Sequence, residues 1–589
     1  MAARERLDIG VRSLNNREQA VLYSANQLSI GARLTANHLA QGKAEQVDNR
    51  SATIEAAGEG RIAAQVVRNT NAHLVTEIVE TAREQHVEYE AHGRNERLKE
   101  GTQHQQGWYV YNDESNHLHT PDGINHERWH KYDYNRVTRQ TEVQETAPGK
   151  IIAGGRLEID ADELHNSDSQ IIAGGQLAVS TAQGNAHQHE TFGTATVTDE
   201  GVLHSYWRHR EKGRDSTGHS QQAYRPAPQV RQFSLGSHAY REFATTLPST
   251  SAPDNRPANV PDVSVRVDTT AIQLPGSSFF IVNPDSPHYL VETDPRFTNY
   301  RQWLGSDYML RQLGLNQDNI HKRLGDGFYE QRLLREQIAK LTGHRFLNGY
   351  SNDEEQFKAL MNNGLTAAKS FNLTPGIALS SEQIARLTSD IVWLVEQTVS
   401  LPNGGSQKVW VPQVYLRVRP GDVNGGGALL AGNVTELNIA KTLHNGGTIA
   451  GRQAMYLNAG TLENSGRISA DRLQVRTSGD INNIGGVLDA GQTMLLQAGG
   501  DINSRSTLAN NANGQGHITY LDRVAGIYLT AGKDGTLAAT AQGNIRLDAA
   551  ELANQSENGR TLLRAGQDIT IGTQRTEQLQ ANHFDNDNH

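Results

Sequence analysis

The pentapeptide IIAGG occurs twice in this chain, at residues 151–155 and 171–175, twenty residues apart. This interval is too short for a domain and too long for a coiled-coil heptad, and periods of roughly 20 to 50 residues are typical of stacked supersecondary units. The interval returns after Gly427, where aliphatic residues recur at one place in successive units. They are Leu429, Ile449, Ile468 and Leu488. The period therefore predicts one repeated unit rather than a set of unrelated domains.

Within a unit the residues follow the pattern apolar-x-apolar-x-Ala-x-x-apolar-x-Asn. One example consists of Leu157, Ile159, Ala161, Leu164 and Asn166. Alternation with period two predicts short strands whose apolar side chains point inward. Gly and Asn favour the corners between strands, where left-handed backbone conformations are common. Strands this short bury a core only when they are stacked, so the sequence predicts a mainly β fold, a right-handed parallel β-helix with coils of about 20 residues.

The composition excludes several classes of function. The chain has 589 residues and no cysteine, which rules out disulfides, thiolate metal sites and cysteine nucleophiles. Its net charge of −10 argues against nucleic acid as a partner, because phosphate binding needs a basic surface. No run approaches the roughly 20 apolar residues of a transmembrane segment. The first residues lack the apolar stretch of a signal peptide, and we expect the chain to be an internal part of a longer protein.

Two departures from the repeat predict segments that project from the β-helix. Residues 1–185 form a first repeat region, and within it residues 76–149 include stretches that alternate for longer than one coil allows. Two such stretches that leave and re-enter a β-helix predict an antiparallel hairpin. Residues 186–295 contain a second excursion and a Tyr/Pro-rich connector, since ten of the 16 prolines lie between Pro226 and Pro295.

Residues 296–420 differ from the rest because their apolar residues have helical spacing. Capping boxes at Ser351–Glu354 and Ser380–Gln383 predict two helix starts. Trp303 and Trp393 lie on the apolar stripes of the predicted helices and are expected in the core. We expect a mostly α-helical insert that ends in short strands at residues 408–419.

After the insert the repeat returns at residues 421–575 as a second β-helix. We expect about seven coils and a rod on the order of 35 Å long, at about 4.8 Å per coil. The coils at 20–75 and 150–182 are expected to form a separate stretch. Residues 576–589 are polar, which predicts a frayed tail.

Aromatic and basic residues gather in the two excursions, and these are the candidates for recognition. Aromatic side chains on a projecting segment favour binding, and arginines beside them would meet an anionic lipopolysaccharide or an acidic protein loop. The alternative is that the aromatic residues pack onto the stalk and the cations lie on a solvated hairpin face. The candidates are Trp108, Tyr109, Tyr111, Trp129, Tyr132, Tyr134, Tyr206, Trp207, Arg208 and Arg210.

Metal binding and catalysis each have a weaker basis. The triplets HLH at 117–119 and HQH at 187–189 place two histidines on one side of a strand, but no further ligand at suitable spacing completes a site. Asp160, Asp162 and Glu163 resemble the acidic cluster of a polysaccharide-cleaving β-helix enzyme. The two aspartates, however, occupy outward positions of a coil, where polar residues are expected anyway. We therefore predict no metal, no cofactor and no catalytic residue.

The coil pattern AGG-x-L-x-I-x-A-x-x-L-x-N resembles filamentous haemagglutinin repeats, which occur in large exoproteins of bacterial two-partner secretion. The order of segments is more specific. Repeats with excursions are followed by a Tyr/Pro-rich and helical insert containing LVETDPRFTNYRQWLGSDYMLRQLGL, and then by a second repeat array. This order resembles the middle of CdiA-type contact-dependent growth-inhibition effectors.

The resemblance implies a secreted, non-enzymatic stalk at the exterior of a Gram-negative outer membrane. In that family a first repeat region forms the stalk, a central region binds a receptor on the target cell, and a second repeat region helps to deliver a C-terminal toxin. The implied partners are an outer-membrane protein or lipopolysaccharide of target bacteria and a two-partner secretion transporter in the producing cell. Two alternatives stay open, a haemagglutinin-type adhesin for host glycan or protein and, more remotely, a β-helix polysaccharide lyase or hydrolase.

Overall fold

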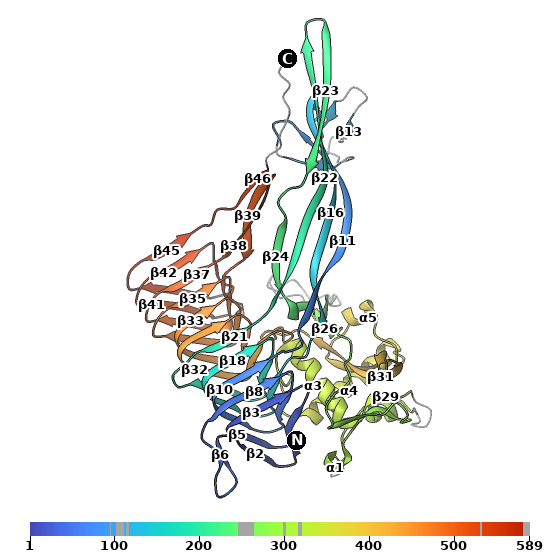
Figure 1. The fold of residues 1–589 in the computed structure, drawn as a ribbon, viewed down its shortest axis with the longest axis vertical. Coiled ribbons are helices and arrows are strands. Elements are labelled where there is room, and N and C mark those ends of the chain that lie inside the picture. The colour runs from blue at the N-terminus through green and yellow to red at the C-terminus, as the bar shows by residue number, and fades with distance from the viewer. Residues whose placement is uncertain are drawn as a thin grey trace.

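The chain folds as one β-helix that carries a projecting sheet and an α/β insert (Figure 1). The computed structural model describes residues 1–589 with the exception of a few segments. These are residues 95, 100, 102–110, 113–116, 239, 245–263, 299–301, 316–320, 531–532 and 581–589. The termini of the β-helix lie at opposite ends of the stack of coils, and the insert lies along its flank.

Short parallel strands build the β-helix. Those before the insert are β1 (Ala2–Ala3), β2 (Arg6–Gly10), β3 (Ser13–Arg17), β4 (Val21–Ser24), β5 (Gln27–Gly31), β8 (Ala44–Arg50), β9 (Thr53–Ala56), β10 (Gly60–Thr70), β17 (Lys150–Ala153), β18 (Leu157–Ser167), β19 (Gln170–Ala173), β20 (Gln176–Thr181) and β21 (Ala186–His189). Those after it are β32 (Leu429–Asn445), β33 (Thr448–Asn464), β34 (Arg467–Thr477), β35 (Ile481–Ile484), β36 (Val487–Ala498), β37 (Ile502–Arg505), β40 (Gly526–Leu529), β41 (Thr536–Ala541), β42 (Ile545–Asp548), β43 (Glu551–Asn554), β44 (Arg560–Ala565) and β45 (Ile569–Gly572). All of these belong to one sheet, which confirms the predicted fold class.

The inward-facing aliphatic residues of successive coils stack in one column as the repeat predicts, except that the predicted position in β32 is wrong by one residue. Ile449 pairs with Ile468, and Ile468 pairs with Leu488 in the next coil. The residue below Ile449 is Leu430, not the predicted Leu429. Leu429 points to the other face of β32, where it packs with Ala339 of the insert and is fully buried. The prediction was wrong at this position because β32 is covered on both faces, so that apolar residues no longer mark one side.

Buried asparagines form a ladder parallel to the aliphatic column. Asn49 Nδ2 donates to Asn69 Oδ1, and Asn69 Nδ2 donates to Asn166 Oδ1, both at 2.8 Å. The same arrangement recurs where Asn445 donates to Asn464 at 2.8 Å and Asn464 to Asn483 at 2.7 Å. Each amide in a ladder satisfies the next, so a polar residue is tolerated inside the stack. Asn recurs at the same place in each repeat unit because its side chain stacks on the next Asn, as well as because Asn favours corners.

The two repeat arrays are one continuous β-helix, and the expected second stretch is not separate. Strands β19, β20 and β21 all pair in parallel with β32, so residues 190–428 leave and re-enter between adjacent coils. At this junction Gln188 lies opposite Asn445. Its longer side chain donates instead to the carbonyl oxygen of Thr448 at 3.2 Å, and Asn445 Oδ1 has no hydrogen-bond partner among the described residues. Two coils can stack wherever their strand edges match, however many residues separate them in the sequence.

A further hairpin interrupts the second array. Strands β38 (Thr507–Asn513) and β39 (Gly516–Arg523) pair antiparallel and leave the stack between β37 and β40. The array therefore has one coil fewer than predicted within the described residues. Strand β46 (Glu577–Gln580), in the segment expected to be a frayed tail, pairs with β39. The two remaining short strands, β6 (Arg33–Leu34) and β7 (Ala40–Gln41), form a small hairpin near the N-terminal end.

The two predicted excursions form one projecting sheet. Its strands are β11 (Val75–Ala91), β12 (Leu98–Lys99), β16 (Arg128–Glu145), β22 (Phe192–Glu211), β23 (Arg214–Tyr224) and β24 (Gln229–Ser234). The sheet order is β12-β11-β16-β22-β23, with β24 on the lower half of β22. Figure 1 shows these long strands rising well beyond the β-helix. A small sheet of β13 (Tyr111–Asn112), β14 (Leu118–His119) and β15 (Asn125–His126) lies between β12 and β16 in the chain.

The insert is an α/β domain: residues 296–420 contain the expected helices and end in strands, and its sheet also includes strands from residues 240–293, where a connector was expected. Its strands are β25 (Tyr240–Ala244), β26 (Ser264–Asp268), β27 (Phe280–Val282), β28 (Tyr289–Thr293), β29 (Arg323–Gly325), β30 (Ile391–Ser400) and β31 (Ser406–Arg417), after a 3-10 turn η1 (Leu235–His238). Its helices are α1 (Pro295–Thr298), α2 (Asp307–Gln312), α3 (Gly327–Thr342), α4 (Asp353–Phe371) and α5 (Ser381–Ala385). The seven strands form one sheet with its own apolar core.

The helix prediction was right for α3 and α4 and wrong for residues 391–400. The capping box of α5 is present, but the helix ends at Ala385 and IVWLVEQTVS becomes β30. The apolar residues of that run are buried on both faces, so the apolar pattern does not distinguish a helix from a strand. The β-branched residues of the run favour the strand. At α4 the N-cap is Asn352, whose Oδ1 accepts from the backbone of Glu354 and Glu355, and not Ser351. Trp393 is core as predicted, although on a strand, and Trp303 is half-buried.

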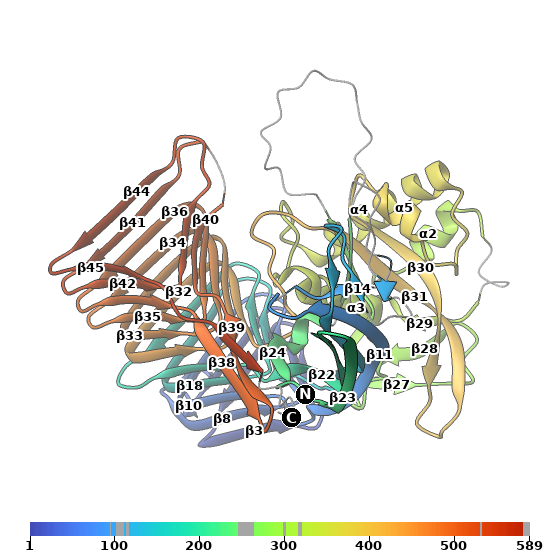
Figure 2. The same cartoon turned by 90° about the horizontal axis from the view of Figure 1, so that it is seen from above.

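Buried ion pairs hold the insert against the β-helix. Arg335 of α3 lies 3.0 Å from Glu55 of β9, and both side chains are more than nine-tenths buried. Arg345 pairs with Asp353 at 2.9 Å and lies 3.6 Å from the same Glu55. Nearby, Lys150 of β17 meets Glu336 of α3 at 3.1 Å. Figure 2 shows the result, with the β-helix on one side, the insert on the other, and the base of the projecting sheet between them.

Candidate functional site

The structure divides the ten predicted recognition residues into three groups. Trp108 and Tyr109 lie outside the described residues, and for Tyr111 the structure places only the backbone, in β13. Trp129, Tyr132 and Tyr134 are at most 2 % exposed. Tyr206, Trp207 and Arg208 are half-buried, and Arg210 is exposed. The buried aromatic residues thus take the packing role that was the alternative to recognition, and surface contact is left to the residues of β22 and β23.

One face of the projecting sheet carries a row of stacked rings. Trp129 stacks on Tyr206 with centroids 4.2 Å apart, and Tyr206 stacks on His219 at 4.5 Å. The row starts in the interior at Trp129 and ends on the outer strand β23 at His219, which is exposed. Cross-strand aromatic pairs of this kind stabilise a sheet. The row therefore connects the packed centre of the sheet to a half-exposed aromatic surface.

The opposite face is closed by tyrosines and one arginine. Tyr132, Tyr134 and Tyr224 form a buried cluster with Leu203. The guanidinium of Arg97 lies 3.8 Å from the ring centre of Tyr132 and donates to the hydroxyl of Tyr224 at 2.7 Å. Burial, and then the hydrogen bond to Glu90, raise the pKa of Tyr132 well above its usual range. This face is a small core and offers little contact area to a partner.

The remaining candidates lie near the far end of β22. The ring of Trp207 covers Gly218, its pairing partner on β23, so closely that a side chain at 218 would collide with it. Covering a glycine with a cross-strand aromatic ring protects a weak point of a sheet. Arg208 contacts His117 Nε2 at 3.1 Å, and Arg210 donates to Glu127 at 2.7 Å. Of the two predicted arginines, Arg210 is therefore partly neutralised by Glu127, while Arg208 is positioned by His117.

Histidines lie on the strands that carry these candidates, and two of them have lowered pKa values. His204 Nδ1 and His219 Nε2 are 3.2 Å apart. Burial, and then the neighbouring His219, lower the pKa of His204. Burial, and then His92, lower the pKa of His130 to about 4. The lowered pKa of His204 favours its neutral ring, which limits the positive charge beside Tyr206 of the aromatic row.

The hairpin β38–β39 braces the projecting sheet from the side. The backbone N–H of Arg225 donates to Gln515 Oε1 at 2.6 Å, and Gln515 Nε2 donates to the carbonyl oxygen of Ala223 at 2.7 Å. The Tyr520 hydroxyl accepts from the N–H of Val230 at 2.6 Å. These contacts join the second array to the sheet at the point where β23 turns into β24. The extra hairpin, which the repeat pattern did not predict, thus fixes the direction in which the sheet projects.

A cleft lies where the β-helix, the base of the projecting sheet and the insert meet. Its volume is about 670 Å³, which is within the usual range for small-molecule sites of roughly 300–1,000 Å³. The walls come from residues 140–148, from the extended segment 268–277 and from α3, over a floor that includes Ser51 and Gln170. No sequence signal indicated it, because its residues are scattered from Gln19 to Gly427 and share no motif.

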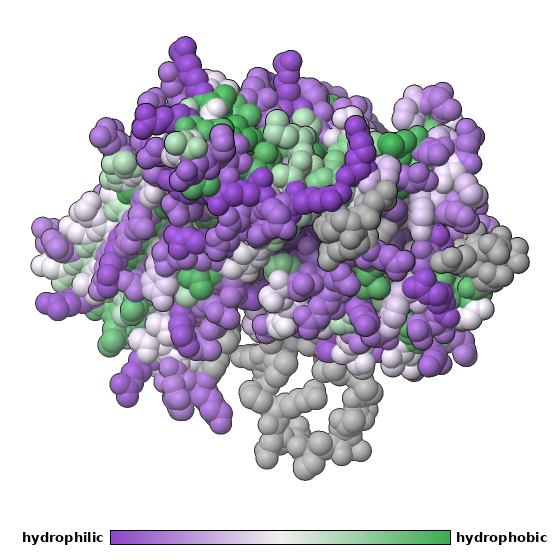
Figure 3. Space-filling model, turned by 90° about the horizontal axis from the view of Figure 1, so that it is seen from below, coloured by the Kyte–Doolittle hydropathy of each residue, from purple (hydrophilic) through white to green (hydrophobic). Residues whose placement is uncertain are grey.

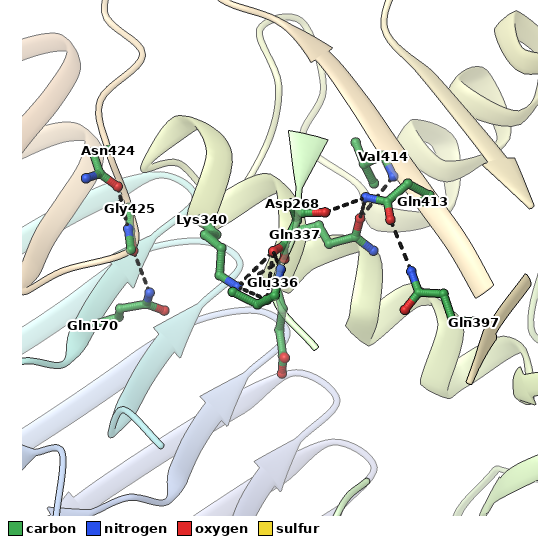
Figure 4. A network of polar contacts seen from close by, with 12 residues as sticks. Gln170, Asp268, Glu336, Gln337, Lys340, Gln397, Gln413, Val414, Asn424 and Gly425 are labelled. Atoms are coloured by element: carbon green, nitrogen blue, oxygen red, sulfur yellow. Dashed lines mark hydrogen bonds and ion pairs between the residues drawn. The ribbon is translucent and has the colours of Figure 1, made fainter. Parts of the chain in front are cut away.

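A polar network closes one wall of the cleft (Figure 4). Gln337 of α3 accepts from the backbone N–H of Val414 at 2.9 Å and from Gln413 Nε2 at 3.2 Å. Gln413 in turn accepts from Gln397 at 3.4 Å, and Lys340 donates to Asp268 at 3.0 Å. The network joins α3 to β30 and β31, so this wall is preformed.

Two predicted alternatives gain no support from the geometry. Among the described residues, none of the groups of three or more His, Cys, Asp or Glu side chains is placed to hold a metal ion. His187 of the HQH triplet stacks between His165 and His444 with planes 1° and 6° apart, so the three rings do not converge on one point. Asp160 and Asp162 both pair with Lys43 at 2.9 Å on the outer face of the coils. The described helices also include none long and apolar enough to cross a membrane.

Comparison with known proteins gives one consistent result. The family described as "Haemagglutinin repeat" matches residues 6–83, 125–201, 398–485, 468–547 and 540–589, more than half of the chain. "Toxin CdiA" of Yersinia pestis is 38 % identical over 219 residues, which is 37 % of this chain and 6 % of that protein. "16S rRNA endonuclease CdiA" of Enterobacter cloacae is 32 % identical over 286 residues, 48 % of this chain and 8 % of that protein.

A third relative, "tRNA nuclease CdiA" of Escherichia coli, is 33 % identical over 304 residues, which is 48 % of this chain and 9 % of that protein. The chain thus spans less than a tenth of the length of these relatives. No solved structure matches the chain. The family match covers the coils and parts of the projecting sheet, and the function of the sheet and the cleft has to be argued from their geometry.

Proposed function

The chain belongs to the haemagglutinin-repeat family, as a CdiA-type protein, and from that premise we propose that it is a non-enzymatic stalk segment whose projecting sheet recognises a receptor on target bacteria. The family is one of secreted, cell-surface proteins. Two of these relatives are named as nucleases, but the matched segments are only 8 % and 9 % of those proteins. We assign any such activity to other parts of a longer protein. The receptor would be an outer-membrane protein or lipopolysaccharide.

One observation carries the proposal, namely the contrast between the projecting sheet and the coils. The sheet stands away from the β-helix, is braced by β38–β39, and carries half-exposed Tyr206 and Trp207 on opposite faces of β22, with Arg208 and Arg210 following in the same strand. Aromatic residues with arginine neighbours are typical of the residues that dominate binding energy. The outward positions of the coils are mostly polar and repeat from coil to coil. The lower end of the molecule is also mostly hydrophilic, with separate hydrophobic patches (Figure 3). Such a surface offers few distinct contacts.

The test is binding of the whole chain to outer-membrane vesicles from a panel of Gram-negative bacteria. Fluorescently labelled chain should bind vesicles of target strains saturably and be displaced by unlabelled chain. Trp207→Ala and Arg210→Ala should each weaken binding about 10-fold or more, as expected for interface residues of this type. Matched controls on the coils are Tyr456→Ala and Arg476→Ala, since both side chains are exposed on β33 and β34. They should change the dissociation constant less than about two-fold.

Protease-treated vesicles and vesicles with truncated lipopolysaccharide separate the two receptor classes. If the coil variants weakened binding as much as the sheet variants, recognition would not lie on the sheet. Binding to animal-cell glycans or proteins without binding to bacterial vesicles would support the adhesin instead.

A further inference from the structure

The cleft between the β-helix, the projecting sheet and the insert has the chemistry of a site for a neutral ligand rich in hydroxyl groups. Glutamine dominates its polar lining to an unusual extent. The glutamines are Gln19, Gln140, Gln144, Gln170, Gln273, Gln337, Gln397 and Gln413. Each amide offers a donor and an acceptor without a charge. We propose that this cleft binds a neutral oligosaccharide, a role that does not depend on recognition by the distal part of the sheet.

The cationic groups of the lining are already paired with carboxylates of the wall. Lys150 meets Glu336 at 3.1 Å, and Arg332 donates to the same carboxylate at 2.9 Å. Lys340 donates to Asp268 at 3.0 Å and to the Thr270 hydroxyl at 2.7 Å. All three cations of the described lining are therefore engaged with the wall itself. A phosphate or carboxylate ligand would have to break one of these pairs, and most of its gain would be lost in doing so.

The part of the cleft open to a ligand combines amides with aliphatic surface. Gln144 at the base of the projecting sheet and Gln273 on the facing segment are both exposed. Next to Gln273, Ile272 and Leu274 are half-buried and pack on the core between insert and β-helix, and Pro275 follows them. A sugar ring has hydroxyl groups around its rim and C–H groups on its faces, so it needs both kinds of surface. Ligand sites generally combine a mostly apolar lining with a few well-placed polar groups.

The wall behind these residues is rigid enough to select a ligand. The amides of Gln337, Gln397 and Gln413 are held by one another and by the backbone of Val414 (Figure 4). On the floor, Gln170 Nε2 donates to the carbonyl oxygen of Gly425 at 2.6 Å, and Gln19 Oε1 accepts from Gly276 at 2.8 Å. Groups that are positioned before the ligand arrives lose little conformational freedom on binding.

The experiment is a binding screen of the full chain against immobilised hexasaccharides of glucose, galactose, mannose and N-acetylglucosamine, with phosphorylated and carboxylated saccharides beside them. We expect at least one neutral hexasaccharide to bind with a measurable dissociation constant, confirmed by titration calorimetry. Gln144→Ala and Gln273→Ala should each weaken it about 3- to 10-fold, the usual effect of one lost hydrogen bond. Ala271→Trp, on an exposed position of the lining, should abolish binding by filling the cleft.

Gln492→Ala is the matched control, because Gln492 is an equally exposed glutamine on β36 of the coils. It should leave binding unchanged. Circular dichroism of each variant checks that the fold is retained. The proposal is overturned if no neutral saccharide binds the folded chain or if anionic saccharides bind better. It is also overturned if an extended peptide occupies the cleft and saccharides do not. Loss of vesicle binding by Trp207→Ala with saccharide binding intact would separate the two sites.

Discussion

The asparagine ladder makes the sharpest quantitative prediction, because β33 offers a buried and an exposed asparagine in one strand. Asn464 is buried, accepts from Asn445 at 2.8 Å and donates to Asn483 at 2.7 Å. Asn458 is exposed and donates to Asn438 at 2.8 Å. Both residues take part in an amide ladder between the same coils. Alanine removes amide hydrogen bonds at both positions, to two neighbouring coils in the interior for Asn464 and to one at the surface for Asn458.

The expected cost of Asn464→Ala follows from the groups it leaves behind. Besides a long contact of 3.5 Å to the carbonyl oxygen of Val487, the two ladder hydrogen bonds are lost at roughly 0.5–1.5 kcal/mol each, and a buried acceptor left without a partner costs about 1–3 kcal/mol more. Asn483 Oδ1 is that acceptor, whereas Asn445 Nδ2 keeps its bond to the carbonyl oxygen of Arg467 at 3.2 Å. The total is roughly 2–6 kcal/mol. Asn458→Ala should cost less than about 0.5 kcal/mol, because water replaces the lost partner.

Hydrogen exchange by mass spectrometry measures both variants in the intact chain. Each coil contacts mainly its neighbours, so destabilisation should stay local to β32–β35. A loss of 2 kcal/mol corresponds to about 30-fold faster exchange in that region, while exchange in the insert stays unchanged. Equal acceleration by the two variants, or none by Asn464→Ala, would refute the claim that the buried amides are a stabilising ladder.

Three further predictions concern the insert and the sheet. Glu55→Ala should destabilise docking of the insert by roughly 3–5 kcal/mol, because Arg335 and Arg345 stay buried and share the single carboxylate of Asp353. Urea denaturation measures this loss. The control is Glu45→Ala, which removes the exposed partner of Arg12 and should cost less than about 0.5 kcal/mol. Burial raises the pKa of Glu330 to about 7. The stability that the protonated carboxyl contributes is therefore complete below the pKa of the unfolded chain and is lost as the pH rises through 7. The thermal midpoint of the insert should fall between pH 5 and pH 8, and Glu330→Gln should reduce this pH dependence. Trp129→Ala should cost about 3–5 kcal/mol and abolish the near-ultraviolet circular dichroism of the stacked rings, because the side chain is fully buried.

The sequence predicted the coils because their period is set by local physics. Ile449, Ile468 and Leu488 occupy one column since every coil buries the same side of the same strand. The register failed at Leu429, where the insert covers the outer face and makes both sides of β32 apolar. The same ambiguity turned residues 391–400 from an expected helix into β30.

What the sequence could not show depends on contacts between distant segments. The joining of β21 to β32 relies on strand edges that match across the whole insert. The burial of Trp129 results from pairing of β16 with β22, two strands that were expected in separate excursions. The cleft has walls from three parts of the chain, and its glutamines follow no spacing. Each of these features is a property of the assembled fold.

Site-specific photocrosslinking tests the central claim, recognition by the projecting sheet, most directly. A photoreactive amino acid would replace His219 or Ser216 on β23, or Tyr456 or Gln492 on the coils, all of which are exposed. After binding to target outer-membrane vesicles and illumination, crosslinked products would be identified by mass spectrometry. The account predicts a specific vesicle component crosslinked from β23 and displaced by unlabelled chain, with background labelling from the coils. A specific product from Tyr456 or Gln492 and none from β23 would contradict it.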